Sequence, residues 1–150
     1  MTEKDVYIFY NERVKVAYSE IEARGNALPI ELLFEINSAF DHLKRYHVDG
    51  QSEEEAAQKA YAHLKRGVLD AYKIKLKYFN EEYQKLFSDN DNKCENDNAD
   101  YIRNAIREKN MITKLATKAR MSEGSNNVSD AFDGWYAVSI QIDEFEKKYF

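Results

Sequence analysis

The sequence contains very few of the residues that most often make turns. Among its 150 residues there are only one proline and five glycines. An all-β sandwich or barrel needs many short turns, which rely heavily on these two residue types. The shortage therefore argues against such folds and predicts a small number of long helices.

Cysteine is just as scarce. The single cysteine, Cys94, has no partner for an internal disulfide and stands in the polar run SDNDNKCENDN, without a nearby histidine. A zinc site needs several cysteine or histidine ligands, so this segment does not predict one. Acidic neighbours disfavour a thiolate, which argues against a nucleophilic role. We expect an exposed thiol in a reducing compartment.

Long apolar runs and common ligand-binding motifs are also missing. No run approaches the roughly 20 residues that span a bilayer, and the start MTEKDVYIFY lacks the features of a signal peptide. No glycine-rich nucleotide loop, HExxH zinc motif or calcium loop occurs. These absences predict a cytoplasmic protein with no membrane partner, no cofactor and no metal.

What the sequence does contain is helical periodicity. Hydrophobic residues make up 43% of the chain and charged residues 33%, a balance typical of a folded domain. Apolar residues return every third or fourth place in about five segments. We therefore predict an all-α fold, with residues 1–150 forming a single-domain bundle of about five helices.

Two of the expected helices contain the candidate catalytic residues. Pro29 suits a first turn, and the helix that follows is expected to bury Leu33, Ile36, Phe40 and Leu43. A capping box of Ser52 and Glu55 then begins a helix that runs to about Phe87. At 1.5 Å per residue, this long central helix would exceed ~50 Å.

The tetrapeptide HLKR occurs twice, in FDHLKRY and in YAHLKRG, on these two helices. The short turn between the helices makes them antiparallel neighbours, which predicts a shared polar cluster. A histidine beside a carboxylate can act as a general acid or base, and an arginine can hold a phosphate, so the cluster has the parts of a metal-independent ribonuclease site. Two alternatives are a buried structural network and ordinary boundary residues with solvated ends. The candidate catalytic residues are Asp41, His42, His63, Arg66 and Asp70.

The segments EINSAFDHLKR and AYAHLKRGVLDAYK resemble the small all-α HEPN-type proteins of prokaryotic defence and toxin–antitoxin systems. The resemblance spans about residues 30–75. Catalytic members carry an Arg-x(4–6)-His motif, and no arginine stands at that spacing before His42, His47 or His63. The resemblance therefore implies a non-catalytic member that binds or regulates another molecule.

A basic stripe marks the fourth expected helix. Its four cations fall on one helical face, opposite the apolar positions Ile102, Ala105, Ile112 and Ala116. Such a stripe could follow a nucleic-acid backbone, or it could be the solvated side of an amphipathic helix. The candidate nucleic-acid-binding residues are Arg103, Arg107, Lys114 and Lys118.

The last expected helix has the most regular apolar pattern, with spacings that alternate between three and four. This pattern is typical of a coiled-coil-like seam, either within the chain or between two copies. The candidate interface residues are Trp135, Val138, Ile142, Phe145 and Tyr149.

The sequence as a whole predicts a non-catalytic protein-interaction or regulatory module. Its partner would be another protein or a second copy, which would bind through the last helix or the long third one. Two other functions stay open, an RNA-directed HEPN-like nuclease and a nucleic-acid-binding protein that uses the basic helix.

Overall fold

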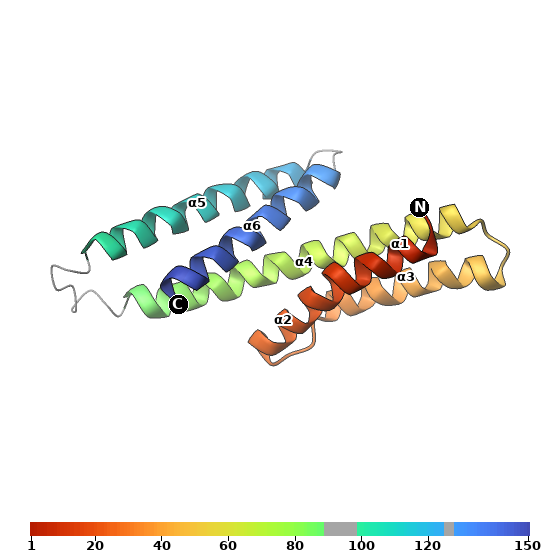
Figure 1. Cartoon of the computed structure of the whole chain (residues 1–150), viewed down its shortest axis with the longest axis horizontal. Coiled ribbons are helices and arrows are strands. Elements are labelled where there is room, and N and C mark those ends of the chain that lie inside the picture. Colours follow the sequence, from red (N-terminus) through yellow and green to blue (C-terminus); the bar gives the residue numbers. More distant parts are fainter. Residues whose placement is uncertain (89–98, 125–127) are drawn as a thin grey trace. The chain divides into compact units, whose positions relative to one another are not determined.

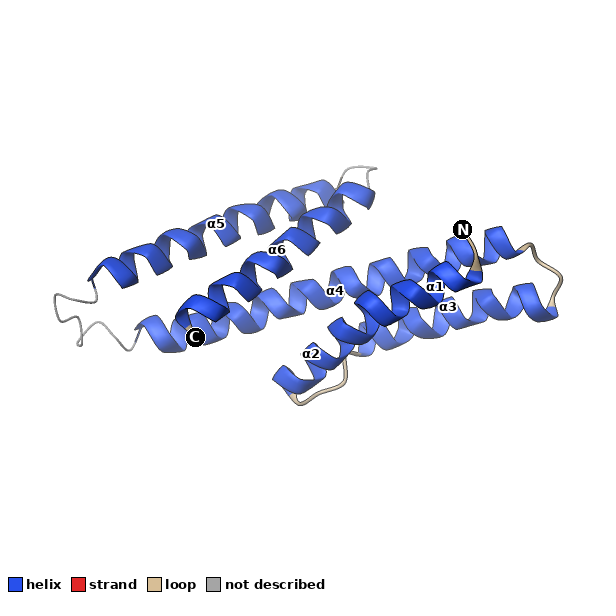
Figure 2. Ribbon diagram, viewed as in Figure 1, coloured by secondary structure: helices blue, strands red, loops and turns tan. Residues whose placement is uncertain are grey.

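The computed structural model describes residues 1–88, 99–124 and 128–150. Figure 2 shows helices and connecting loops in this part of the chain, and no strand occurs in it. The predicted all-α class and the long central helix are both confirmed. Cys94 lies outside the described residues. The helices, labelled in Figure 1 where space allows, are α1 (Glu3–Phe9), the π-helical turn η1 (Tyr10–Val14), α2 (Lys15–Gly25), α3 (Ile30–Val48), α4 (Glu53–Ser88), α5 (Ala99–Glu123) and α6 (Val128–Tyr149).

The chain divides into two compact units, Met1–Ile74 and Lys75–Phe150. The first unit contains α1, η1, α2, α3 and the beginning of α4, and the second contains the end of α4 with α5 and α6. None of the described helices is long and apolar enough to cross a membrane.

The first unit begins with a capped helix whose register changes in its middle. The Thr2 hydroxyl accepts from the backbone N–H of Asp5, and the Asp5 carboxylate accepts from the backbone N–H of Thr2, which completes a capping box. Val6 and Val14 are buried. The π-helical turn η1 between them widens the helix and leaves Tyr10 partly exposed.

Helices α3 and α4 are antiparallel and pack closely through small residues. A Cβ atom added to Gly67 of α4 would lie 2.6 Å from Leu32 Cδ1 of α3, so a larger residue there requires the Leu32 side chain to shift. Helix α3 buries Leu32, Ala39 and Leu43, and α4 buries Ala56, Ala57 and Ala60 near its start. Such short side chains allow two helix backbones to approach closely.

This close packing overturns part of the predicted α3 stripe. Leu33 and Phe40 were expected to be core residues, but both are exposed, and only Leu43 of the predicted set is fully buried. Ile36 is half-buried. The buried positions include Leu32 and Ala39, each one residue before a predicted position. The face that meets α4 is therefore rotated relative to the prediction, and Phe40 points away from the core.

The second unit has a core of large side chains. The regular stripe of α6 is buried, with Trp135, Val138, Ile142 and Phe145 at most 3% exposed. The ring of Phe145 packs edge-on against Phe79 of α4, at 5.1 Å between ring centroids. Helices α5 and α6 lie side by side, and Gly134 of α6 leaves room for Ala119 of α5.

Candidate functional site

The two HLKR histidines meet between α3 and α4, as the expected register requires. The rings of His42 and His63 stack at a centroid distance of 5.0 Å. His63 Nδ1 lies 2.6 Å from Glu35 Oε2, and both side chains are about four-fifths buried. His42 Nδ1 is buried without a hydrogen-bond partner, and burial lowers the pKa of this histidine. The positive neighbour Arg45 adds to that effect, and both favour the neutral form of His42.

Two of the other three members of the predicted cluster pair with side chains of their own helices. Asp41 pairs with Arg45 of its own helix at 3.0 Å, and Asp70 lies 3.6 Å from Lys73 Nζ. Arg66 is exposed. The carboxylate that reaches the histidines is instead Glu35, which the sequence prediction did not include. Its spacing of seven residues from His42 was the signal, because positions i and i+7 share one helix face.

A second polar network lies in the second unit, with a buried lysine and a partly exposed Asp143. Lys75 of α4 is only 2% exposed. Its ammonium group donates to Asp143 Oδ1 at 2.7 Å and to Ser139 Oγ at 2.9 Å, both on α6. Because an unpaired buried ammonium group is costly, this network requires α4 and α6 to pack in one register. Sequence reasoning missed it, since a lysine gives no indication of burial by itself.

The basic stripe of α5 lies on the surface. Arg103, Arg107, Lys114 and Lys118 are all exposed. Arg103 lies 3.6 Å from Asp100, a contact between two highly exposed side chains. Opposite the stripe, Ala105, Ile112 and Ala116 are buried, as the sequence indicated. The geometry thus leaves these cations accessible to a negatively charged partner.

The candidate interface on α6 lies inside the chain. Four of its five side chains belong to the core of the second unit, and Tyr149 is half-buried, with its ring 5.1 Å from that of Tyr101. The seam therefore packs within the chain, which was one of the two alternatives that the sequence left open. A second copy could reach it only if the core opened.

The surface of α3 that faces away from α4 is unusually apolar. Phe34 is 64% exposed and Phe40 is 73% exposed. We call this surface the α3 face, and its apolar members are Ile30, Leu33, Phe34, Phe40 and Val48. Scattered apolar residues are common on protein surfaces. Five exposed apolar residues on one side of a single helix, interrupted by Asn37, Asp41 and Lys44, make the α3 face a candidate interaction site.

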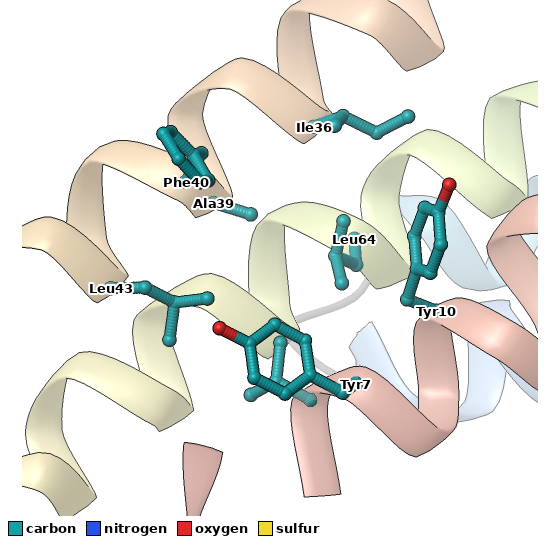
Figure 3. A pocket seen from close by; sticks show the side chains of 8 residues that line it. Tyr7, Tyr10, Ile36, Ala39, Phe40, Leu43 and Leu64 are labelled. Atoms are coloured by element: carbon teal, nitrogen blue, oxygen red, sulfur yellow. The ribbon is translucent and has the colours of Figure 1, made fainter. Parts of the chain in front are cut away.

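A groove runs beside the α3 face, with α1 and η1 on its other side. It has a volume of about 260 Å³. In Figure 3, Tyr7 and Tyr10 project from α1 and η1, while Phe40 and Leu43 project from α3 and Leu64 lies between them. The two tyrosine hydroxyls are the polar groups at its margin. The lining residues are Val6, Tyr7, Tyr10, Ile36, Ala39, Phe40, Leu43 and Leu64.

Hydrogen bonds hold the wall of the groove in place. The Tyr7 hydroxyl donates to Glu3 Oε1 at 2.6 Å, and the other oxygen of Glu3 lies 2.8 Å from His47 Nε2 at the end of α3. The backbone N–H of Glu3 donates to Glu53 of α4 at 3.0 Å. The bond from Tyr7 lowers the pKa of Glu3 and raises that of Tyr7. Helix α1 is thus tied to both neighbouring helices.

Within the described ranges, no group of three or more histidine, cysteine or acidic residues is arranged to hold a metal ion. Comparisons with protein-family models, with curated proteins and with solved structures gave no match.

Proposed function

We propose that this chain is a non-catalytic protein-interaction module and that it binds an amphipathic helix through the α3 face and the adjoining groove. The observation that carries the proposal is the exposure of Phe34 and Phe40 on a helix whose opposite side is well packed. Two phenylalanines in water forgo about 1.5–3 kcal/mol each of burial free energy. A partner that covers them recovers this energy.

The size of the apolar surface supports this proposal. Phe40 belongs to both the α3 face and the groove, so the two surfaces are continuous. With roughly 200 Å² for a whole aromatic side chain, Phe34, Phe40 and Tyr7 together expose on the order of 400 Å². That area from three side chains already equals a large apolar patch on a monomeric protein.

The shape of the groove favours a helical ligand. A groove between two helices accepts an amphipathic helix, whose anchors recur at three- and four-residue spacing. The π-helical turn η1 brings Tyr10 to the groove margin, and Glu3 fixes Tyr7 there. A wall that is already ordered lowers the entropy cost of binding.

The biological setting rests on the resemblance of residues 30–75 to HEPN-type proteins. We extend the proposal to a regulatory role in a prokaryotic defence or toxin–antitoxin system. The nuclease alternative has less support, because Arg66 is exposed and Asp70 is paired with Lys73.

A designed peptide tests the interaction function. The probe is a fluorescent helix of about 20 residues, with leucines that follow the three- and four-residue spacing of helix-in-groove ligands. We expect saturable binding that weakens at least ~10-fold in Phe40→Glu, because the variant places a charge in the apolar contact.

Two controls make this experiment specific. A peptide of the same composition with its leucines scrambled should not bind, and Met111→Glu, which alters an exposed apolar residue of α5, should leave binding unchanged. Equal binding of both peptides, or equal binding by the wild type and Phe40→Glu, would contradict the proposed function.

A second candidate function, nucleic-acid binding, is favoured by the exposed cations of α5. Arg107, Lys114 and Lys118 occupy one exposed face, although the whole chain has a net charge of −5. A local basic face on an acidic protein can attract a polyanion.

Fluorescence anisotropy with single-stranded RNA tests this second candidate. Contacts to three or four phosphates would make affinity fall steeply with salt, with a slope of about −2 to −3 in log units. The double variant Arg103→Glu/Arg107→Glu should lose binding, whereas Lys147→Glu on α6 should keep it. An affinity that does not respond to salt would rule this function out.

A further inference from the structure

We infer that the helix bound by the α3 face is α3 of a second copy of this chain. This inference rests on the proposed function and names its partner. It also differs from the dimer predicted from sequence, because the α6 seam is buried inside the second unit. The outward side of α3 remains available, and it has the pattern that a helix pair requires.

That pattern is an alternating spacing of three and four residues. From Ile30 the exposed positions continue through Leu33 to Asn37, Phe40 and Lys44. This spacing keeps side chains on one stripe and is typical of helices that pack along their length. Phe34 and Val48 broaden the stripe. Helix α3 therefore carries two seams, one used by α4 and one that faces outward.

Asn37 lies in the middle of the outward seam and is exposed. A carboxamide both donates and accepts, so Asn37 on a two-fold axis can hydrogen-bond to Asn37 of the second copy. An aspartate or a lysine could not pair with its own copy in this way. Asn37 and Lys44 are the two polar members of this seam, and a polar residue within a seam commonly fixes the register of two helices. Asn37 thus fits the centre of a symmetric pair.

Charge favours an antiparallel arrangement. In a parallel pair, Asp41 would lie beside Asp41 of the second copy, and Lys44 beside its own counterpart, so like charges would repel. In an antiparallel pair that crosses at Asn37, Phe34 comes level with Phe40 of the second copy. Lys44, which pairs with Asp49 of its own chain at 2.7 Å, then comes level with Ile30, next to the acidic Glu31, and Asp41 comes level with Leu33. Each aromatic side chain gains an aromatic neighbour, and the like charges separate.

The area of the surface agrees with a stable dimer. A specific interface of standard size buries about 800 Å² on each partner. Phe34, Phe40 and Tyr7 supply on the order of half of this area, and the remaining α3-face residues add to it. A symmetric interface uses the same surface on both copies. Here each copy provides Phe34 and Phe40, and each of these meets the other residue of the pair in the second copy.

Sedimentation velocity of the full chain over about 1–100 µM tests the inference, since this range covers the usual dissociation constants of small dimers. We expect the wild type to approach the mass of two chains as concentration rises. Phe40→Glu should keep the mass of one chain throughout, with an unchanged circular-dichroism spectrum. Met111→Glu on α5 serves as the control and should still dimerise. A wild type that stays monomeric, or a Phe40→Glu variant that dimerises normally, overturns the inference.

Disulfide cross-linking tests the antiparallel arrangement, in a Cys94→Ser background. Asn37→Cys should form a covalent dimer on oxidation, and Gln58→Cys, an exposed position on α4, should not. A mixture of Ile30→Cys and Lys44→Cys should yield the mixed disulfide. If each of these two variants instead cross-links only to itself, the helices are parallel and the antiparallel pair is refuted.

Failure of this inference can be separated from failure of the proposed function. If the chain is monomeric but Phe40→Glu still abolishes binding of the leucine-patterned peptide, the partner is a different helix and the interaction function stands. If the chain is monomeric and the peptide does not bind, both proposals fail.

Discussion

Two pairs of phenylalanines, one pair in each unit, occupy opposite environments. In Met1–Ile74, Phe34 and Phe40 lie on the surface of α3. In Lys75–Phe150, Phe79 and Phe145 are at most 1% exposed and pack against each other. The difference arises because the first unit joins α3 and α4 through alanine and glycine, whereas the second fills its interior with aromatic rings.

This contrast shows that apolar residues have two different uses within one chain. The second unit uses its aromatic residues for stability. The first unit obtains its α3–α4 contact from small side chains, which leaves Phe34 and Phe40 available to a partner. Buried phenylalanines therefore contribute to stability, whereas exposed ones contribute to binding. Substitution of a phenylalanine should lower the free energy of unfolding more when the residue is buried.

Phenylalanine truncation gives the largest expected effect. Phe145→Ala should lower the free energy of unfolding by about 3–5 kcal/mol, because it leaves a cavity in the core. Phe40→Ala should change it by less than ~0.5 kcal/mol, as exposed positions usually do. Urea unfolding at low protein concentration measures both values. Losses of similar size would mean that the two environments do not differ as described.

The buried lysine of the second unit gives the next largest effect. Asp143→Ala should cost about 2–3 kcal/mol, since it removes the carboxylate from an ammonium group that stays buried. Lys75→Met breaks the same ion pair but removes the buried charge and keeps an apolar stem, so we expect a loss below ~1 kcal/mol. Chemical denaturation compares the two variants. If Lys75→Met is the more damaging, the ion pair itself is the main stabilising feature.

The close packing of the first unit predicts a smaller loss. Gly67→Ala should cost about 1 kcal/mol, because overpacking against Leu32 exceeds the gain in helix propensity. In a Leu32→Ala background the same substitution should cost less, since the closest contact is then removed and only Glu35 Cβ, at 3.1 Å, remains near the added atom. A double-mutant cycle of unfolding free energies checks this coupling. Additive effects would show that Leu32 does not limit the approach at Gly67.

The histidine pair predicts the smallest effect. Because burial lowers the pKa of folded His42, the unfolded chain binds its proton more readily. The free energy of unfolding should therefore fall as pH drops below about 6.5, by less than ~1.4 kcal/mol per pH unit, until the folded pKa is reached. His42→Gln should reduce this dependence in urea unfolding at pH 7.5 and 5.5. An unchanged pH dependence would exclude His42 as its source.

Much of the fold could be predicted from the sequence. Helical periodicity and the shortage of turn-forming residues indicated the all-α class, and the Ser52 cap marked the start of α4, where its hydroxyl accepts from the backbone N–H of Glu55 at 3.2 Å. The buried face of α3 was not predicted correctly. Leucine and phenylalanine rank above alanine as core residues, so Leu33 and Phe40 seemed the better choice. The structure instead buries Ala39, which lies on the same face of α3 as Leu32, the residue that meets Gly67.

The candidate site could likewise be predicted only in part from the sequence. The meeting of His42 with His63 followed from helix length and a short turn. The pairing of His63 with Glu35 depends on which face of α3 meets α4. The predicted stripe placed the wrong face there, so Glu35 was not expected near His63. The groove was also missed, because it requires the π-helical turn at Tyr10, and a single apolar pattern does not reveal such a turn. Close contacts between two helices depend on the residues of both, and a π-helical turn changes the register within one helix. Neither feature can be predicted from the apolar pattern of a single segment.

Radical footprinting of the wild type at low and high concentration tests the central claim most directly. We predict that Phe34 and Phe40 are oxidised readily in dilute solution and become protected as concentration rises, while Phe79 and Phe145 stay protected throughout. Strong protection of Phe34 and Phe40 even in dilute solution would place them in the core of the single chain. Equal oxidation of both residues at every concentration would show that no second copy covers the α3 face.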